Sequence, residues 1–102
     1  MTSLLSKHSA ALHSLFRAHH VVKADVFGSA LGPGFSPSSD VDLLITFDSN
    51  IALLDYADNY FALKEKLELL LERQVDLVSS RSLKNPVLIE SINRTKQSLY
   101  AA

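Results

Sequence analysis

The amino-acid sequence predicts an α/β (α+β) domain in which a small mixed β-sheet is flanked by helices. Three observations support this prediction: a length of 102 residues, an apolar content of 47%, and two kinds of hydrophobic spacing that follow one another. Segments with apolar residues at helical spacing enclose shorter runs that are rich in β-branched residues. The predicted order is helix, strand, turn, strand, helix, strand, helix, which places helices over a sheet. This length is typical of one domain, so we expect residues 1–102 to form a single unit.

The first forty residues are predicted to form a helix, a strand and a loop. Residues 3–18 form the helix, whose apolar stripe consists of Leu5, Leu12, Leu15 and Phe16. Alternating apolar and polar residues over 21–27 predict a strand, which ends at Gly28-Ser29. Residues 30–39 hold two of the three Gly and two of the three Pro, which indicates a turn-rich loop.

The later elements follow from the same kinds of pattern. An apolar, β-branched run at 40–47 predicts a second strand, and residues 74–78 predict a short third one. The longest helix is predicted over 53–72, with apolar positions 53, 57, 60, 61, 67, 70 and 71. Asn-Pro at 85–86 is typical of a helix start, and the helix that follows carries Val87, Ile89 and Ile92. Residues 96–100 are ambiguous, with a terminal edge strand as one interpretation.

The charge balance and the lack of cysteine exclude several classes of protein. Ten basic and 11 acidic residues give a net charge of −1, so we expect no direct binding of nucleic acid. Without cysteine there is neither a disulfide scaffold nor a thiolate metal site. The longest strictly apolar run, at 51–54, is far shorter than the roughly 20 residues that span a bilayer. We therefore expect a soluble, cytoplasmic protein without a membrane partner.

Three carboxylates interrupt strands that are otherwise apolar: Asp40, Asp42 and Asp76. Residues two apart on a strand project from the same face, about 6.5 Å apart along the backbone. Asp40 and Asp42 therefore point the same way, and Asp76 joins them if the third strand lies beside the second. The alternative is that Asp-x-Asp at the start of a strand only caps a turn.

A convergence of three carboxylates requires cations. Two like charges at about 4 Å repel by roughly 4 kcal/mol at an effective dielectric constant of 20, and a divalent ion removes this penalty. Clustered carboxylate oxygens favour Mg²⁺ or Mn²⁺ over Zn²⁺. Two such ions can bind both the attacking and the leaving oxygen of a phosphoryl or nucleotidyl transfer.

Gly28 and Ser29 lie upstream of the carboxylates, where the first strand ends. Glycine lets the backbone approach a ligand closely. Free backbone N–H groups and a hydroxyl at the start of a short helix can bind a phosphate oxygen. The alternative is a turn that merely ends the strand.

The run Phe27-Gly28-Ser29, ten residues, then Asp40-Val41-Asp42 resembles the Gly-Ser-x10-Asp-x-Asp pattern of the DNA-polymerase-β-like nucleotidyltransferase superfamily. In its small size, the chain resembles the minimal branch of this superfamily, the minimal nucleotidyltransferase (MNT) domain proteins. Val75-Asp76-Leu77-Val78 stands in the place of the third carboxylate strand, and residues 82–100 resemble the closing helix of the family. The resemblance therefore covers most of the chain and implies a polymerase-β-like nucleotidyltransferase fold.

The resemblance also implies roles for these residues. Gly28 and Ser29 would hold the phosphates of ATP or another nucleoside triphosphate, and Asp40 and Asp42 would bind both of two Mg²⁺ ions. Asp76 would bind the catalytic metal and help to activate the acceptor hydroxyl. MNT proteins are similar to antitoxins that act on a partner protein, a HEPN-domain toxin. Some of them transfer AMP from ATP to a tyrosine of this toxin.

One departure from the family pattern concerns positively charged side chains. Ala30 and Gly32 stand where the family commonly carries Arg, so the corner has no cation and triphosphate binding or turnover is expected to be reduced. A cation would then come from Lys84, Arg81 or the partner. Two alternatives stay open: a non-catalytic antitoxin that neutralises its partner by complex formation, and a subunit that modifies a small, aminoglycoside-like molecule.

The remaining polar and aromatic residues have simpler interpretations. We interpret Lys64, Lys66 and Arg73 as the solvated face of the long helix. The four histidines are interpreted as solvent-facing or capping residues: His8, His13, His19 and His20. Three aromatic residues of the long helix are expected in the core: Tyr56, Tyr60 and Phe61. A domain this small needs an acceptor from elsewhere, so we expect some apolar surface to contact another chain.

Overall fold

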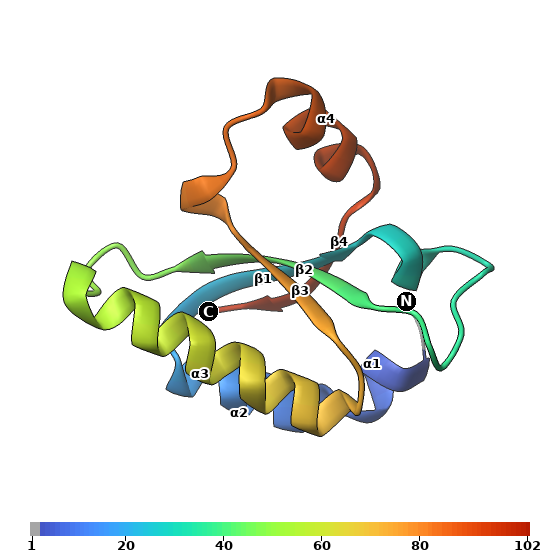
Figure 1. The fold of residues 1–102 in the computed structure, drawn as a ribbon, viewed down its shortest axis with the longest axis horizontal. Coiled ribbons are helices and arrows are strands. Elements are labelled where there is room, and N and C mark those ends of the chain that lie inside the picture. The colour runs from blue at the N-terminus through green and yellow to red at the C-terminus, as the bar shows by residue number, and fades with distance from the viewer. Residues whose placement is uncertain (1–2) are drawn as a thin grey trace.

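A computed structural model describes residues 3–102, apart from the side chain of Ser29, and contains a four-stranded sheet with helices on both faces (Figure 1). The helices are α1 (Ser3–Lys7), α2 (Ser9–Ala18), α3 (Leu53–Leu71) and α4 (Pro86–Thr95), with 3-10 helices η1 (Gly28–Leu31) and η2 (Ser80–Ser82). The strands are β1 (Val21–Phe27), β2 (Val41–Phe47), β3 (Val75–Ser79) and β4 (Gln97–Ala101). The predicted α/β class, with a small mixed sheet flanked by helices, is confirmed.

The strand order is β3-β2-β1-β4. β1 is antiparallel to both β2 and β4, whereas β2 and β3 are parallel and are joined by α3. A parallel pair needs such a crossover, because the chain must return to the end of the sheet where β2 began. The third strand therefore lies beside the second, and the C-terminal segment is an edge strand.

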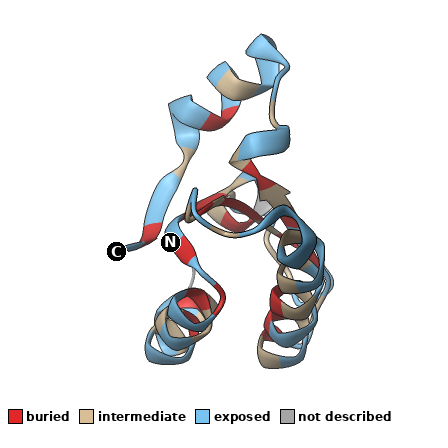
Figure 2. Ribbon diagram, turned by 90° about the vertical axis from the view of Figure 1, so that its left-hand side faces the viewer, coloured by how far each residue is buried: buried red, intermediate tan, exposed pale blue. Residues whose placement is uncertain are grey.

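The hydrophobic core lies between the sheet and the helices α2 and α3, which cover the same face (Figure 2). Alternate residues of β2 point into it, and all are buried: Val41, Leu43, Ile45 and Phe47. The two helices contribute fully or almost fully buried side chains: Leu12, Phe16, Leu63, Leu67 and Leu71. Since α2 and α3 both pack on this face, the other face is covered by α4.

The helix predicted over 3–18 is in fact two helices. His8 separates α1 from α2, because its ψ angle of 15° lies outside the helical region. Leu5 and Leu12 remain buried on either side of the break. The predicted apolar stripe is therefore right, and the predicted continuity is wrong.

The long helix begins at the predicted residue and ends one residue early, where Glu72 adopts a left-handed conformation with φ 54°. Its buried residues recur every four positions, so only a narrow stripe of α3 meets the sheet. Leu53 and Phe61 lie outside that stripe and are 84% and 64% exposed. The expected place of Phe61 in the core is wrong.

α4 begins as predicted, after Asn85. The Oδ1 atom of Asn85 accepts hydrogen bonds from the backbone N–H groups of Val87 and Leu88, at 3.0 and 3.4 Å. Ile92 is the buried residue of this helix, which stands over the open face of the sheet.

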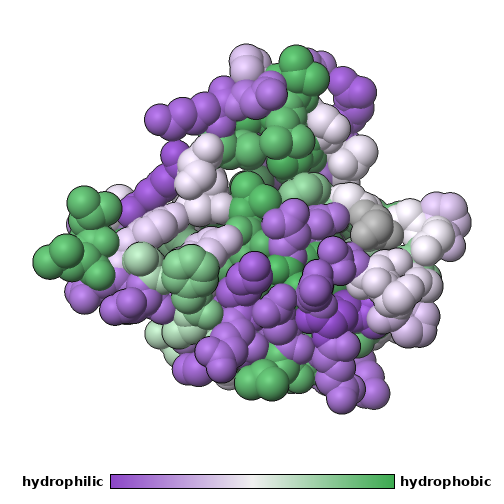
Figure 3. Space-filling model, viewed as in Figure 1, coloured by the Kyte–Doolittle hydropathy of each residue, from purple (hydrophilic) through white to green (hydrophobic). Residues whose placement is uncertain are grey.

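Exposed apolar side chains gather on α4 and at the N-terminal end of α3 (Figure 3). Val87 and Leu88 form the first group, and Leu53 and Leu54 the second. Within residues 3–102, no helix has both the length and the apolar character that crossing a bilayer requires.

Candidate active site

Asp42 and Asp76 lie side by side on neighbouring strands. The two residues are direct partners in the parallel register of β2 and β3. The residues on either side of Asp42, Val41 and Leu43, are buried in the core, so both carboxylates project from the opposite face of the sheet. Neighbouring strands are about 4.8 Å apart. The predicted convergence of these two carboxylates is therefore confirmed.

Gly28 brings the end of β1 against the carboxylate of Asp42. Phe27 pairs with Asp42 in the antiparallel register, so Gly28 follows directly beside it. Gly28 has φ +74°, and a Cβ atom added there would overlap Oδ2 of Asp42 and lie 3.2 Å from its Cγ. A side chain is thus excluded for two independent reasons, backbone conformation and space. The corner that contains Gly28 and the backbone of Ser29 lies on the same face as the two carboxylates.

Asp40 precedes β2 by one residue and lines a cavity of about 320 Å³ at the start of β3. The other residues that line this cavity are Lys64, Glu68, Gln74, Val75 and Asp76. One oxygen of Glu68, Oε2, accepts a hydrogen bond of 3.0 Å from the backbone N–H of Val75. This contact ties α3 to the first residue of β3 and so fixes the strand that carries Asp76.

The three carboxylates are not gathered into a preformed metal site. Within residues 3–102, no set of three or more Asp, Glu, His or Cys side chains is arranged to hold a metal ion. Asp42 is the register partner of Asp76 on the neighbouring strand, and Asp40 lines the same cavity as Asp76. The predicted meeting of all three on one surface is thus seen only pairwise. Repulsion between like charges opposes a closer arrangement until a cation compensates it.

A comparison with known families supplies the identification. The family described as "Polymerase beta, Nucleotidyltransferase" matches residues 11–102, a range that includes the Gly28 corner and all three carboxylates. The chain belongs to this nucleotidyltransferase family. Members of the family generally use divalent metal ions, and the carboxylate oxygens of the site are suitable ligands for such ions.

Relatives of this nucleotidyltransferase agree with that assignment. The protein adenylyltransferase MntA of Thermococcus cleftensis is 35% identical over 85 residues, which cover 83% of this chain and 79% of the relative. A solved structure provisionally described as a minimal nucleotidyltransferase is 38% identical, covers 91% of this chain and 90% of the other, and superposes with a TM-score of 0.68.

A more distant solved structure shows the same fold. It holds the tri-AMPylated HEPN toxin of Shewanella oneidensis in complex with an MNT antitoxin. The match covers 96% of this chain and 73% of the other, with 20% identity and a TM-score of 0.67. The polymerase-β-like fold is therefore shown by structure as well as by sequence.

The cation expected beside the carboxylates is not Arg81. Its Nη2 donates a hydrogen bond of 2.8 Å to the carbonyl oxygen of Asp48, and its guanidinium lies 5.0 Å from the ring centroid of Tyr56. Asp48 follows the last residue of β2, whereas Asp42 is near the first, so about six residues of extended strand, roughly 20 Å, separate the two ends. Lys84 is exposed and does not line the carboxylate cavity.

Lys64 is the cation that lines the cavity with Asp40 and Asp76. The sequence interpretation placed it on the solvated face of the long helix, which is wrong because the residue is half-buried. Lys64 lies four residues before Glu68, so one turn of α3 presents a positive and a negative side chain to the cavity. Helical spacing alone gave no signal for this role, since Asp40 and Asp76, which line the same cavity, lie outside α3.

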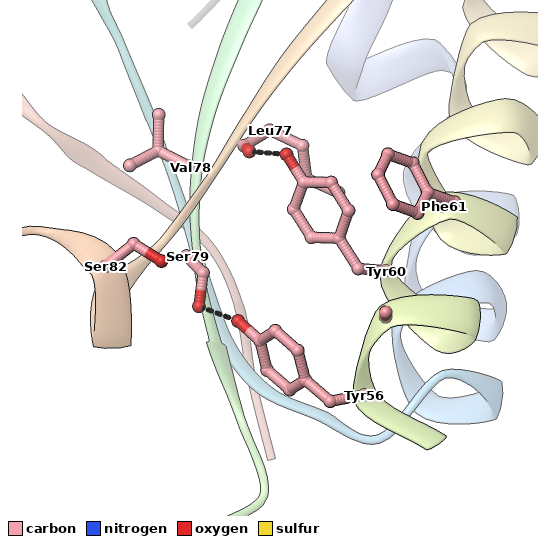
Figure 4. Close-up of a pocket in the computed structure, with 8 residues that line it drawn as sticks. Tyr56, Tyr60, Phe61, Leu77, Val78, Ser79 and Ser82 are labelled. Atoms are coloured by element: carbon pink, nitrogen blue, oxygen red, sulfur yellow. Dashed lines mark hydrogen bonds between the residues drawn. The ribbon is translucent and has the colours of Figure 1, made fainter. Parts of the chain in front are cut away.

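An aromatic cavity of about 440 Å³ lies between α3 and the free edge of β3 (Figure 4). The Tyr60 hydroxyl donates a hydrogen bond to the Leu77 carbonyl oxygen, and the Tyr56 hydroxyl donates one to Ser79 Oγ. Burial, followed by the negative charge of Asp76, raises the pKa of Tyr60. The cavity is therefore within electrostatic reach of a predicted catalytic carboxylate.

Two of the four histidines, His13 and His19, contribute to packing rather than to the site. His19 is buried, and its Nδ1 lies 2.8 Å from the carbonyl oxygen of Leu15, so it caps α2 from within the fold. The Nε2 atom of His13 lies 3.0 Å from the carbonyl oxygen of Leu99. The interpretation of the histidines as solvent-facing or capping is confirmed for His19, which caps α2, and for His20, which is exposed.

Proposed function

We propose that this nucleotidyltransferase transfers AMP from ATP to a tyrosine hydroxyl of a HEPN-type toxin and thereby acts as its antitoxin. The observation that carries the proposal is the pairing of Asp42 with Asp76 beside the Gly28 corner. The names of two similar proteins support the substrate. The Thermococcus cleftensis relative is a protein adenylyltransferase, and the Shewanella oneidensis complex contains an AMPylated HEPN toxin. The net charge of −1 favours a protein partner over a nucleic acid.

Asp40, Asp42 and Asp76 would hold two Mg²⁺ ions. Their ligand atoms are carboxylate oxygens, which Mg²⁺ prefers, and Mn²⁺ is an acceptable substitute. Once bound, such ions neutralise charge on the phosphates and lower the pKa of a coordinated hydroxyl. They would also offset the repulsion between Asp42 and Asp76, which are register partners on the neighbouring strands β2 and β3.

The chain's own residues have distinct tasks in the transfer. The acceptor hydroxyl oxygen attacks the α-phosphorus of ATP, the bond to the bridging oxygen breaks, and pyrophosphate leaves. Asp76, an exposed carboxylate on edge strand β3, would receive the hydroxyl proton. Backbone N–H groups at Gly28 and Ser29 would hold phosphate oxygens, because a glycine corner leaves room for close approach.

A label-transfer assay tests this function. The chain is incubated with α-labelled ATP, Mg²⁺ and a HEPN-type toxin, the partner that we propose. We expect the label on a tyrosine of that partner, and its loss in the variant Asp42→Asn with Asp76→Asn. Asp58→Asn is the matched control, since Asp58 is an exposed acid on α3 that does not line the carboxylate cavity. Transfer that survives the double substitution would refute the catalytic proposal.

Neutralisation by complex formation is a second candidate. Two observations favour it: the corner at 28–34 lacks a positive charge, and exposed apolar side chains on α3 and α4 suit a protein interface. In that case the double Asn variant would still rescue growth when the toxin is expressed. Rescue that requires both aspartates would exclude it.

A further inference from the structure

Arg73 lies in the short connection between α3 and β3, and it is half-buried rather than part of a solvated face. Its Nη1 donates hydrogen bonds to the carbonyl oxygens of Ser36 and Ser39, at 3.0 and 3.1 Å. Its guanidinium carbon lies 4.7 Å from the ring centroid of Phe35, which is a cation–π contact. One side chain thus contacts three residues of a segment that lies more than thirty positions earlier in the chain.

The segment that Arg73 contacts, residues 35–39, leads directly into Asp40. It belongs to neither a helix nor a strand. Its internal bonds are local: Ser39 N–H donates to the Ser36 carbonyl oxygen at 3.0 Å, and Ser36 N–H donates to Ser39 Oγ at 3.0 Å. Arg73 therefore provides a long-range anchor for a segment that has no strand partner.

The same connection holds the backbone on both sides of Asp40. Arg73 binds the carbonyl oxygen of Ser39, the residue before Asp40. The carbonyl oxygen of Gln74 accepts a hydrogen bond of 3.1 Å from the N–H of Val41, the residue after it. Gln74 leads directly into β3, the strand that carries Asp76. Asp40 is thus placed relative to Asp76 through two adjacent residues of one connection.

We propose that Arg73 is a positioning residue that sets the backbone of Asp40 relative to Asp76 for binding a divalent cation. The inference rests on the proposed function, because it assumes that these carboxylates bind the cation. A lysine is a poor substitute, since an ammonium group lacks the planar surface that stacks on Phe35. Without the anchor, the cation must also compensate the entropy of ordering residues 35–39.

Binding of Mn²⁺ in the presence of AMP-PNP, followed by electron paramagnetic resonance, tests the proposal without requiring turnover. We expect Arg73→Ala to raise the Mn²⁺ dissociation constant at least tenfold, and Arg73→Lys to raise it several-fold although it keeps the charge. Arg17→Ala is the matched control, because Arg17 is an exposed arginine of α2 outside the cavity, and we expect a change below twofold. Thermal unfolding of each variant monitors the fold.

A double-mutant cycle with Asp40 distinguishes positioning from a general loss of structure. If Arg73 acts through Asp40, Arg73→Ala weakens Mn²⁺ binding less than twofold in an Asp40→Asn background. Equal losses in both backgrounds, or unchanged binding by a folded Arg73→Ala variant, would overturn the proposal. Should that variant not fold, Arg73→Lys and Phe35→Leu take its place in the same cycle, with the same criteria. Absence of Mn²⁺ binding by the wild-type chain would instead overturn the proposed function, and this inference with it.

Discussion

Replacing Gly28 by alanine is expected to damage both the fold and the site, because two costs coincide at this residue. Its φ of +74° places an alanine in the left-handed region, which costs about 1–2 kcal/mol. The new Cβ would also overlap Oδ2 of Asp42, so the carboxylate must turn away from the corner. An off-rotamer side chain adds about 0.5–1.5 kcal/mol. The two costs sum to roughly 1.5–3.5 kcal/mol of lost stability.

The assay is thermal unfolding followed by label transfer. For a domain of 102 residues, 1 kcal/mol corresponds to a fall in Tm of about 4–8 °C, so we expect Gly28→Ala to lower Tm by roughly 6 °C or more. Transfer at temperatures where the variant is folded should also fall, because Asp42 is displaced. Gly34→Ala is the matched control: nothing lies within 4 Å of its added Cβ, and it is expected to gain about 0.4–1 kcal/mol. Equal Tm values and equal transfer rates for the two variants would refute the reasoning.

Three further predictions concern charge, pH and helix capping. Without divalent ions, Asp76→Asn should stabilise the chain by about 0.2–1 kcal/mol, because like charges directly opposite on neighbouring strands repel. This gain in stability should disappear when Mg²⁺ is present. Urea titrations with and without Mg²⁺ measure the difference. The pKa of Tyr60 is raised in the folded state, so its protonated hydroxyl contributes to the free energy of unfolding. That contribution is fully present below the unfolded pKa of 10.0 and is lost as pH rises through the higher folded pKa. Tyr60→Phe should therefore flatten the pH dependence of the urea midpoint above pH 10, and an unchanged dependence would contradict this. Asn85→Ala should cost about 0.5–2 kcal/mol through loss of the N-cap of α4, and amide exchange should increase most at Val87 and Leu88.

The sequence was sufficient to predict the pairing of Asp42 with Asp76, given one assumption about the sheet. Both residues interrupt apolar runs, so the two-residue period of a strand places them opposite the core. The assumption was that the third strand lies beside the second, and the parallel register of β2 and β3 bears it out. Periodicity cannot supply that neighbourhood, because it reports which face a residue occupies and not which strand lies next to it.

The same limit explains what sequence reasoning missed on the long helix. Lys64 and Arg73 were interpreted as solvated because they are polar residues of an amphipathic segment. Lys64 lines a cavity together with Asp40 and Asp76, and Arg73 contacts the loop at 35–39, so their partners lie outside the long helix. Phe61 was misplaced in the opposite sense, since an apolar residue beside the buried stripe need not be covered. Helical spacing thus separated apolar from polar positions but could not assign neighbours to either.

Sheet topology explains why the site lies where it does. In parallel sheets, ligands commonly bind beyond the carboxyl ends of the strands, yet here Asp42 and Asp76 sit near the starts of β2 and β3. The site nevertheless includes the carboxyl end of one strand, β1. Because β1 is antiparallel to β2, its carboxyl end lies beside the start of β2 and brings Gly28 next to Asp42. The crossover through α3 returns the chain to that same end, so the connection that holds Arg73 must pass close to the loop before Asp40. One antiparallel and one parallel pairing of β2 are therefore enough to bring the corner, the carboxylates and their anchor to one end of the sheet.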